Sequence, residues 1–559
     1  MIPNYNPRAV SRLPNRTLSA LDLFAIMLSG LVALPVLAVL ANLFVGGSGE
    51  TWRHLADTVL AEYVANSIWL CLGVGLGVGA MGTGAAWLVA LNEFPGRRIA
   101  EWALLLPMAM PAYVLAYVYT DLLQFVGPVQ SALREGFGWN KQDYWFPEVR
   151  SLSGAIVLFS CVLYPYVYLL VRTALLERAG GMLEAARMLG LSPWRAVLRV
   201  MLPLARPAIA AGIALALMET LADYGTVAYF AVPTFTTGIY RAWFSLGDRV
   251  AAAQLAACLL GFVVVLLALE RLSRGRARYH DGPQRRRAHR HSLHGLSALA
   301  AQIGCAIPVC IGFLIPTLLL VGMAMDDGDF DFGQRFIGLA RNSFVLASVS
   351  AVLAALLALV AVFAARGGRM VAVLASRLVA LGYAVPGSVI AVGVLIPVTR
   401  LDHALASAIE SAWGGNPGLL LTGGIAALVY AYLARFLTIA LQSVESGFAT
   451  LTPSMEAAAR SLGCGRLETL RRVHFPLLRG SLLTAGLLVF VDVMKELPAT
   501  LVMRPFNFDT LATQTFTLAA DERLAEASLP ALAIVAVGLL PIVILSRQIA
   551  AGRERMAGC

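Results

Sequence analysis

The sequence predicts an all-α polytopic membrane protein with about twelve transmembrane helices, arranged as two parallel six-helix repeats. Of its 559 residues, 59% are hydrophobic and only 14% are charged, and the mean hydropathy is +0.75. Apolar runs of about 20 residues, the length that spans hydrocarbon, recur along the chain. Only helices and closed barrels satisfy their backbone groups in lipid, and runs of this length indicate helices. Matched polar elements between the runs predict the repeats.

The expected spans follow these apolar runs in chain order. They are residues 21–44, 66–91, 99–120, 152–175, 208–230 and 252–270 in the first half, and 298–324, 343–364, 376–398, 418–441, 480–502 and 528–546 in the second. The first run is longer than the ~7–15 residue apolar region of a signal peptide and lacks a small-x-small cleavage site. It is therefore interpreted as a retained helix.

Basic residues indicate the orientation. Arginines precede the first span, follow the last one and crowd the stretch 271–290 between the sixth and seventh spans. This is the positive-inside pattern. Both termini and a basic linker at 271–295 are expected in the cytoplasm, with the first repeat at 1–270 and the second at 296–559. Arginines without interleaved aromatic residues or a nucleic-acid motif do not indicate nucleic-acid binding, despite the net charge of +10.

The two halves match at a constant spacing. Gly190 and Gly463 are 273 residues apart, as are Pro203 and Pro476. Without a gap, the same offset relates Glu219 to Asp492, Asp223 to Glu496, Phe235 to Phe508, Thr237 to Thr510 and Asp248 to Asp521. Asn66 and Asn342 open the second span of each half at an offset of 276. Because six spans is an even number, both halves enter the membrane in the same direction, which indicates a parallel duplication.

A polar element lies between the fourth and fifth spans of each half. In the first half, "EAARMLGLSPWRAVLRVMLPL" (residues 184–204) predicts a helix that ends at Gly190. Ser192 is then a cap and Pro193 the first residue of a second helix. That helix carries Trp194, Val197, Leu198 and Met201 on one apolar face, and Pro203 and Pro207 are expected to break it before the next span. Equal spacing in both halves favours a fitted protein partner over lipid headgroups.

These elements resemble the EAA loop of bacterial importer permeases of the ATP-binding-cassette (ABC) superfamily. The residues that carry the resemblance are Glu184, Ala185, Ala186, Gly190 and Pro203, and then Glu456, Ala458, Ala459, Gly463 and Pro476. The second copy has Ala457 where the pattern has glutamate, and Arg471 and His474 replace Leu198 and Met201. The resemblance implies coupling helices that dock on two cytoplasmic ABC ATPase subunits.

The energy source points to a partner as well. A phosphate-binding P-loop needs a Gly-Lys pair, and the only lysines, Lys141 and Lys495, follow Asn140 and Met494. The chain is therefore expected to be no enzyme and to bind no cofactor, with ATP and Mg on partner subunits.

Charged residues inside spans are candidates for the solute path or its gate. Glu219 and Asp223 lie four residues apart and are expected to share a helix face. Asp492 and Glu496 occupy the matching positions, with Lys495 beside them. Lining of the path and packing between the halves are equally good interpretations. The sequence leaves a metal site unknown, because no His, Cys and carboxylate cluster lies inside the spans.

Further stretches resemble fused ferric-iron permeases. They are residues 93–97, 112–130, 223–243 and 494–513. The resemblance implies ferric iron as the solute, a periplasmic or tethered solute-binding protein that selects it, and the bacterial inner membrane as the location. Permeases for thiamine, phosphonates or polyamines share the layout. The rival class is a 6+6 secondary transporter driven by an ion gradient, which would not need the matched polar elements. A membrane-embedded enzyme would need paired His ligands or a Ser/His/Asp set.

Overall fold

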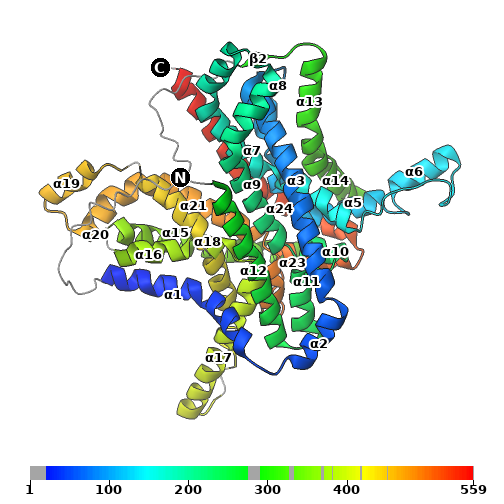
Figure 1. Cartoon of the computed structure of the whole chain (residues 1–559). Helices are drawn as coiled ribbons and strands as arrows, with labels where there is room; N and C mark the ends of the chain where they lie inside the picture. The colour runs from blue at the N-terminus through cyan, green and yellow to red at the C-terminus, as the bar shows by residue number, and fades with distance from the viewer. Residues whose placement is uncertain are drawn as a thin grey trace. The chain divides into compact units, whose positions relative to one another are not determined.

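The computed structural model describes residues 20–274, 290–326, 333–366, 370–380, 382–415, 418–449 and 451–557, and these are mostly helical (Figure 1). The elements up to residue 274 are α1 Ala20–Ala41, η2 Asn42–Phe44, α2 Gly49–Thr58, α3 Leu60–Leu91, β1 Asn92–Glu93, α4 Arg97–Ala103, η3 Leu106–Ala109, α5 Ala112–Leu123, α6 Pro128–Phe137, α7 Leu152–Met188, α8 Pro193–Ala196, η4 Val197–Met201, α9 Leu202–Ala222, α10 Gly225–Tyr229, α11 Phe235–Tyr240, η5 Arg241–Ser245 and α12 Arg249–Arg274.

The second part of the chain has a similar series of helices. Its elements are β2 His291–Ser292, α13 Leu296–Val309, η6 Cys310–Leu314, α14 Ile315–Asp326, α15 Gln334–Arg366, α16 Met370–Val379, η7 Gly382–Ala384, α17 Gly387–Trp413, α18 Ala426–Phe448, α19 Pro453–Ser461, α20 Arg466–Thr469, η8 Leu470–His474, α21 Phe475–Met494, α22 Pro498–Met503, α23 Leu511–Ala520 and α24 Leu524–Ala557.

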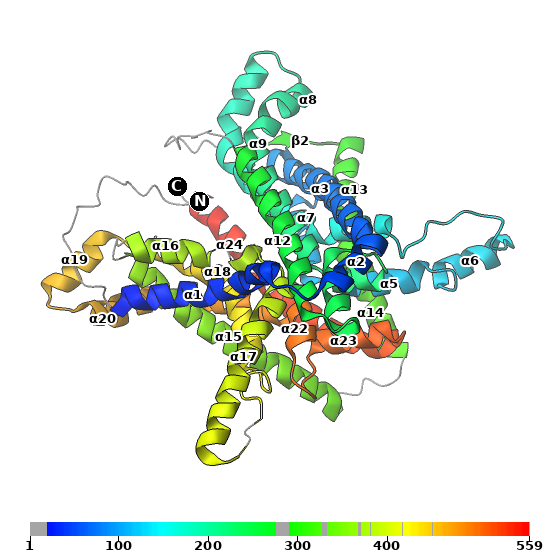
Figure 2. The same cartoon turned by 60° about the horizontal axis from the view of Figure 1, so that its bottom comes forward.

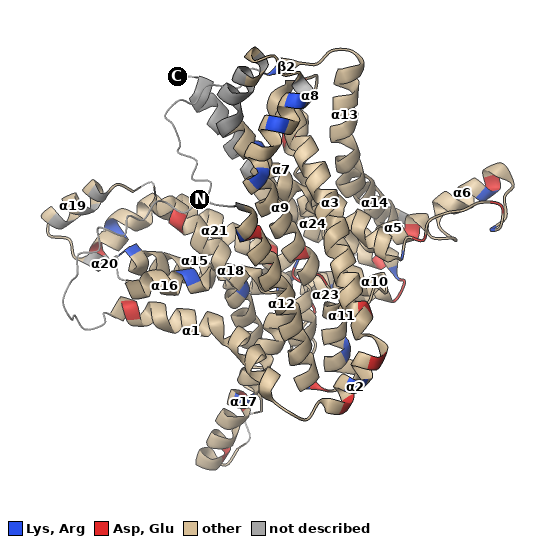
Figure 3. Ribbon diagram, viewed as in Figure 1, with Lys and Arg blue, Asp and Glu red and all other residues tan. Residues whose placement is uncertain are grey.

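The membrane class is confirmed. Among the described residues, eleven helical stretches are long and apolar enough to span a membrane, and a bent pair makes up to twelve. Figure 3 shows that charged residues are sparse along helices such as α3 and α12 and gather toward their ends. This distribution is the one that hydrocarbon imposes, because a charge at its centre costs several kcal/mol, on the order of 3.

Two predicted spans are in fact broken at prolines. The predicted span 99–120 is divided between α4–η3 and α5–α6, which meet at 91°. Pro111 lies at the break, and Met110 before it is extended, with φ −90° and ψ 117°. The predicted span 376–398 straddles a matching break at Pro386, between η7 and α17. Proline removes a helical N–H and forces the preceding residue out of the helical region, so neither apolar run stays one helix.

The tenth span begins later than predicted, at Ala426 rather than near residue 418. A carboxylate explains the shift. Asp402 on α17 accepts hydrogen bonds from the backbone N–H of Leu420, Leu421 and Thr422 at 2.7 to 3.2 Å, and from the Thr422 hydroxyl at 2.7 Å. These bonds hold residues 420–422 in a loop, so the helix starts only after it.

The described residues form two compact units, each built from both sequence halves. One unit draws on residues 1–41, 344–493 and 503–506, and the other on 42–343, 494–502 and 507–559. In the second unit α3, α7 and α9 run side by side (Figures 1 and 2). Gly212 of α9 lets this happen, because a Cβ there would lie 2.6 Å from the Val167 Cα of α7. In the first unit α1 packs on α16 and α17.

Local geometry recurs at matched positions, and it corrects the alignment of the halves. Asn66 donates to the Pro233 carbonyl at 2.9 Å, and Asn342 donates to the Asp509 carbonyl at 3.1 Å. In both cases the residue numbers of the two partners differ by 167. Reciprocal caps open α11 and α23 at Thr234 and Thr510. Their offset is 276, so the loop after α22 holds three extra residues. The gapless pairs Phe235–Phe508, Thr237–Thr510 and Asp248–Asp521 are therefore wrong.

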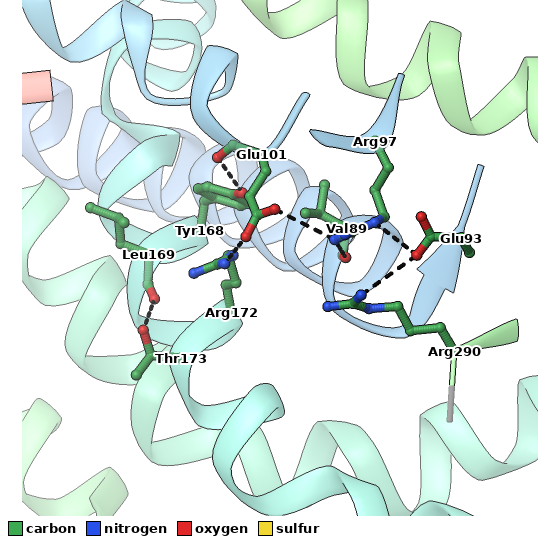
Figure 4. Close-up of polar contacts among 9 residues, drawn as sticks. All are labelled: Val89, Glu93, Arg97, Glu101, Tyr168, Leu169, Arg172, Thr173 and Arg290. Carbon is green, nitrogen blue, oxygen red and sulfur yellow. Dashed lines mark hydrogen bonds and ion pairs between the residues drawn. The ribbon is translucent and has the colours of Figure 1, made fainter. Parts of the chain in front are cut away.

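A buried ionic cluster joins α4 to α7 (Figure 4). The Glu101 carboxylate, 2% exposed, pairs with Arg172 of α7 and, at 3.5 Å, with Arg97 of its own helix. The Tyr168 hydroxyl donates to the Glu101 carbonyl at 2.8 Å. Arg97 also pairs with Glu93 at 3.0 Å.

The cluster continues into the end of the basic linker. Glu93 lies 3.6 Å from Arg290, and β1 pairs in parallel with β2 next to that arginine. The position of α7, which runs on toward residue 188, is thereby tied to the loop that follows α3.

We predict that Glu101→Gln destabilises the protein by about 3–5 kcal/mol, because it takes the carboxylate away from the buried Arg172, whereas Arg97 keeps Glu93. Thermal or denaturant unfolding of the purified chain in detergent measures the change. Glu526→Gln is the control, since the Arg523–Glu526 pair (2.6 Å) is exposed and surface pairs contribute little. Equal shifts for the two variants would show that the cluster does not hold α4 to α7.

Candidate functional site

The first polar element forms the predicted helix–glycine–helix. Gly190 adopts φ +82°, and the Leu191 N–H reaches back to the Ala186 carbonyl at 3.1 Å, which closes the end of α7. Among the described residues, no atom beyond its chain neighbours lies within 4 Å of the position of a Gly190 Cβ, so the backbone angle is what favours glycine there. The Ala196 N–H then bonds the Ser192 carbonyl at 2.9 Å, and α8 begins at Pro193.

The second element repeats this geometry in the other unit. Gly463 also has φ +82°, and the Cys464 N–H bonds the Ala459 carbonyl at 3.0 Å. Ala459 and its counterpart Ala186 are both 5% exposed. The elements differ before the glycine, because α7 is continuous whereas α18 ends at Phe448 and α19 starts anew at Pro453. The side chains of Glu184, Ala185 and Glu456 lie outside the described part.

The prolines do not break the helix before the next span, contrary to the sequence prediction. Val197–Met201 forms a π-turn that runs directly into α9, with Pro203 in the first turn and Pro207 inside that helix. Leu470–His474 forms the same π-turn ahead of Pro476. The wider π-turn accommodates the proline ring and its missing N–H. Each element is thus continuous with a span.

The apolar face of the first element points partly inward, which also differs from the prediction. Val197 and Met201 are 8% and 1% exposed, whereas Leu198 is 45% exposed. His474, at the position of Met201, is 2% exposed and lies edge-on to Phe363 and Phe448, with ring centroids at 5.7 and 5.3 Å. Replacing methionine by histidine therefore alters the inward packing of the second element and not its outer surface.

The outermost apolar side chains are ones that the sequence reasoning missed. Leu189 and Leu462, each directly before the glycine, are 84% and 83% exposed. The sequence signal was available, because Leu189 and Leu462 are 273 residues apart and each lies in a polar stretch. Each element therefore presents an exposed leucine at its glycine turn, and the first element adds Met188, which is 90% exposed.

The acidic pairs do not share helix faces, which corrects the prediction for Glu219 and Asp223. Helix α9 ends at Ala222, and the extended residue Asp223 (φ −70°, ψ 137°) caps α10 instead. Its carboxylate accepts from the Thr226 N–H at 2.8 Å and from the Thr226 hydroxyl at 3.2 Å. Carboxylates are favoured at this position, because the first N–H groups of a helix lack partners.

Glu496 makes the matching cap after α21. Its carboxylate accepts from the N–H of Ala499 at 2.9 Å and of Thr500 at 3.0 Å, and from the Thr500 hydroxyl at 2.7 Å. Lys495 lies in the same non-helical stretch, while Asp492 remains on α21. Glu219, Asp492 and Lys495 are all partly buried.

The two capped breaks lie next to each other. A Cβ on Gly225, two residues after Asp223, would lie 2.7 Å from both Leu497 and Tyr113. The Tyr240 hydroxyl donates to the Pro498 carbonyl. The breaks are thus packed against the aromatic start of α5, where Tyr113 and Tyr117 are buried. Among the described residues, no group of three or more His, Cys, Asp and Glu could hold a metal ion.

Comparisons with known proteins agree with this arrangement. Residues 80–279 match the family described as "Binding-protein-dependent transport system inner membrane component". Over 545 residues, 96% of this chain and 99% of the relative, the chain is 25% identical to the Fe(3+)-transport system permease protein FbpB 2 of Haemophilus influenzae. It is 23% identical over 558 residues, 93% of this chain and 94% of the relative, to the probable ABC transporter permease protein y4fN of Sinorhizobium fredii.

A shorter relative has a higher identity over the part of the chain that it matches. The molybdenum transport system permease protein ModB of Escherichia coli is 30% identical over 206 residues, which are 34% of this chain and 85% of ModB. This chain is therefore about twice as long as that permease. The chain belongs to the family of binding-protein-dependent transport system inner membrane components, the permeases of ABC importers.

Proposed function

We propose that this chain forms the whole membrane part of an ABC importer for ferric iron. The observation that carries the proposal is the pair of helix–glycine–helix elements, each with one exposed leucine before a left-handed glycine. A single surface of this kind is common, whereas two with equal geometry suit two copies of one partner. ATP and Mg²⁺ bind that partner, a pair of ATPase subunits, and this chain hydrolyses nothing.

Movement passes from the elements into the membrane along continuous helices. Each element leads through its π-turn directly into α9 or α21. These helices end at the breaks that Asp223 and Glu496 cap, and each break lies at the end of its helix farther from the element. When ATP draws the ATPase subunits together, tilting of α9 and α21 moves the breaks and changes which side is open. The termini and the linker face the cytoplasm, and a solute-binding protein delivers the solute from outside.

Ferric iron is favoured because the ferric relative matches over almost the full length of both chains. Relatives named for molybdenum, sulfate and 2-aminoethylphosphonate transport match at most 45% of this chain. Those matches reflect the permease repeat itself. The solute is then selected by the binding protein, and the permease provides the gated path.

We predict that the double variant Leu189→Asp with Leu462→Asp loses its ATPase subunits. Burying a leucine in a partner's groove contributes about 1.5–3 kcal/mol, so binding falls at least tenfold for each site. Copurification from detergent measures the loss, and Leu296→Asp is the control because Leu296 is also 85% exposed. Full retention of the ATPases by the double variant contradicts the docking proposal.

The variant Asp223→Asn distinguishes the capping role of the Asp223 side chain from the role of its negative charge. Asp223→Ala should cost about 0.5–2 kcal/mol of stability, whereas Asp223→Asn keeps a good cap. We expect ATP-driven uptake by Asp223→Asn to stay above half of the wild-type rate and that of Asp223→Ala to fall further. If both variants lose uptake equally while Asp223→Asn keeps wild-type stability, the negative charge itself acts in transport.

The solute is tested by uptake into proteoliposomes that contain the chain, its ATPase and its binding protein. We expect ATP-dependent accumulation of radioactive ferric iron, with molybdate and sulfate giving less than a tenth of that rate. Uptake that follows a proton or sodium gradient without ATP contradicts the importer mechanism. ATP-dependent uptake of molybdate or sulfate without uptake of iron supports the importer mechanism and excludes ferric iron as the solute.

A further inference from the structure

The first sequence half contains a pocket that neither the coupling elements nor the helix breaks use. Its volume is about 380 Å³, within the range of small-molecule sites, about 300–1,000 Å³. The polar groups in its wall are Tyr63, Tyr224, Thr237, Tyr240, Arg241 and Ser245. Valine, alanine, proline and phenylalanine side chains complete it. The pocket opens near the end of α9 that lies farthest from the helix–glycine–helix element.

The chemistry of the wall fits a negatively charged ligand. The lining residues include one cation, the guanidinium of Arg241, and no carboxylate. Glu62 and Asp248 lie close by, but neither lines the pocket, and Asp248 accepts from Thr51 at 2.7 Å. Arg241 interacts with the Tyr63 hydroxyl. A guanidinium flanked by hydroxyl donors is suited to carboxylate, phosphate or sulfate oxygens.

The backbone at the pocket is unusual in two places. Arg241–Ser245 forms a π-turn that interrupts the helix after α11, and such turns often occur at functional sites. Ala231 in the wall has φ +54°, a conformation that costs a residue with a Cβ about 1–2 kcal/mol. Asn507, at the matched offset of 276, has φ +57°, so this turn belongs to the repeat, and only the π-turn distinguishes the backbone of the pocket.

The second half provides an internal comparison, because its matched segment lacks this chemistry. At the offsets that the structure supports, Tyr63 corresponds to Leu339, Tyr224 to Leu497, Tyr240 to Phe516 and Arg241 to Thr517. Helix α23 also runs through residues 511–520 as an α-helix, without the π-turn. The fold of the repeat therefore requires neither the guanidinium nor the phenols.

The pocket is connected to the helix breaks. Tyr224 directly follows the capping residue Asp223, and its ring stacks on that of Tyr240 with centroids 3.7 Å apart. The Tyr240 hydroxyl in turn donates to Pro498 at the start of α22, the helix that Glu496 caps. A ligand that moves Tyr224 or Tyr240 thus acts on both breaks.

We propose that this pocket binds an oxyanion through Arg241, either free or as the ligand shell of a metal ion, before the solute reaches the breaks. Its place in import rests on the function proposed above, whereas its binding does not. An iron(III) ion without such a shell would be repelled by Arg241, so the cargo reaches the pocket as an anionic complex.

The experiment measures equilibrium binding of radioactive citrate to the purified full-length chain in neutral detergent, without ATPase or binding protein. We expect saturable binding that Arg241→Thr, the residue of the second half, weakens at least tenfold through loss of a charge-assisted hydrogen bond. Arg241→Lys should retain most of it. Arg249→Thr is the matched control, because Arg249 is exposed in the same region but does not line the pocket.

Competition identifies the source of the oxyanion. Displacement of citrate by ferric citrate or sulfate supports a solute site, whereas displacement by phosphatidylglycerol alone assigns the pocket to lipid and overturns the proposal. Absence of saturable binding of citrate, sulfate and phosphate to the wild type overturns it too, as does equal binding by Arg241→Thr. Citrate binding without iron uptake in proteoliposomes would instead contradict the proposed import of iron and support the oxyanion site.

Discussion

The breaks after α9 and α21 and the loop before α18 depend on carboxylates that accept hydrogen bonds from backbone N–H groups outside the long helices. An unsatisfied backbone group costs several kcal/mol in hydrocarbon, where water cannot replace the missing partner. Asp223, Glu496 and Asp402 each accept two or more backbone N–H bonds at points where an apolar run stops being helical. The breaks determine where α9 and α21 end. These are the helices that the two elements would move in the proposed mechanism.

This constraint explains which parts of the structure the sequence could predict. The number of spans and the turn at Gly190 follow from hydropathy and from the conformational freedom of glycine, both of which are local. The break after Ala222 comes with the hydrogen bond from the Thr226 N–H to Asp223, and the four-residue spacing of Glu219 and Asp223 does not show whether the helix continues that far. The late start of α18 could not be predicted, because its cause, Asp402, lies 18 residues away from Leu420. The three-residue insertion after α22 escaped for a similar reason, since a gapless match at Thr510 looks as good as the true one at Thr513.

In the two helix–glycine–helix elements, the sequence pattern correctly predicted an apolar face but not the direction in which that face points. The i, i+3, i+4 spacing of Val197 and Met201 indicates one apolar face, but periodicity does not say whether it meets a partner or the chain's own core. These residues pack inward ahead of α9, and the most exposed apolar side chains are Met188 and Leu189, where α7 ends. The duplicated position of Leu462 is the reason for proposing docking at these leucines, because a single exposed leucine needs no explanation.

The two halves of the chain hold their corresponding long helices by different contacts. In the first half a buried Glu101 ties α7 to α4, whereas in the second Arg366 donates at 3.0 Å to the carbonyls of Phe448 and Leu451 at the end of α18. In the first half the contact joins α4, which follows α3, to α7 ahead of Gly190. In the second half it joins the end of α15 to the end of α18 ahead of Gly463. The ionic cluster needs a buried partner of opposite charge, but the arginine-to-carbonyl contacts need only a frayed helix end, and α18 provides one by stopping before Pro453. The continuous α7 offers no such carbonyls at this point, and its Arg172 pairs instead with the carboxylate of Glu101.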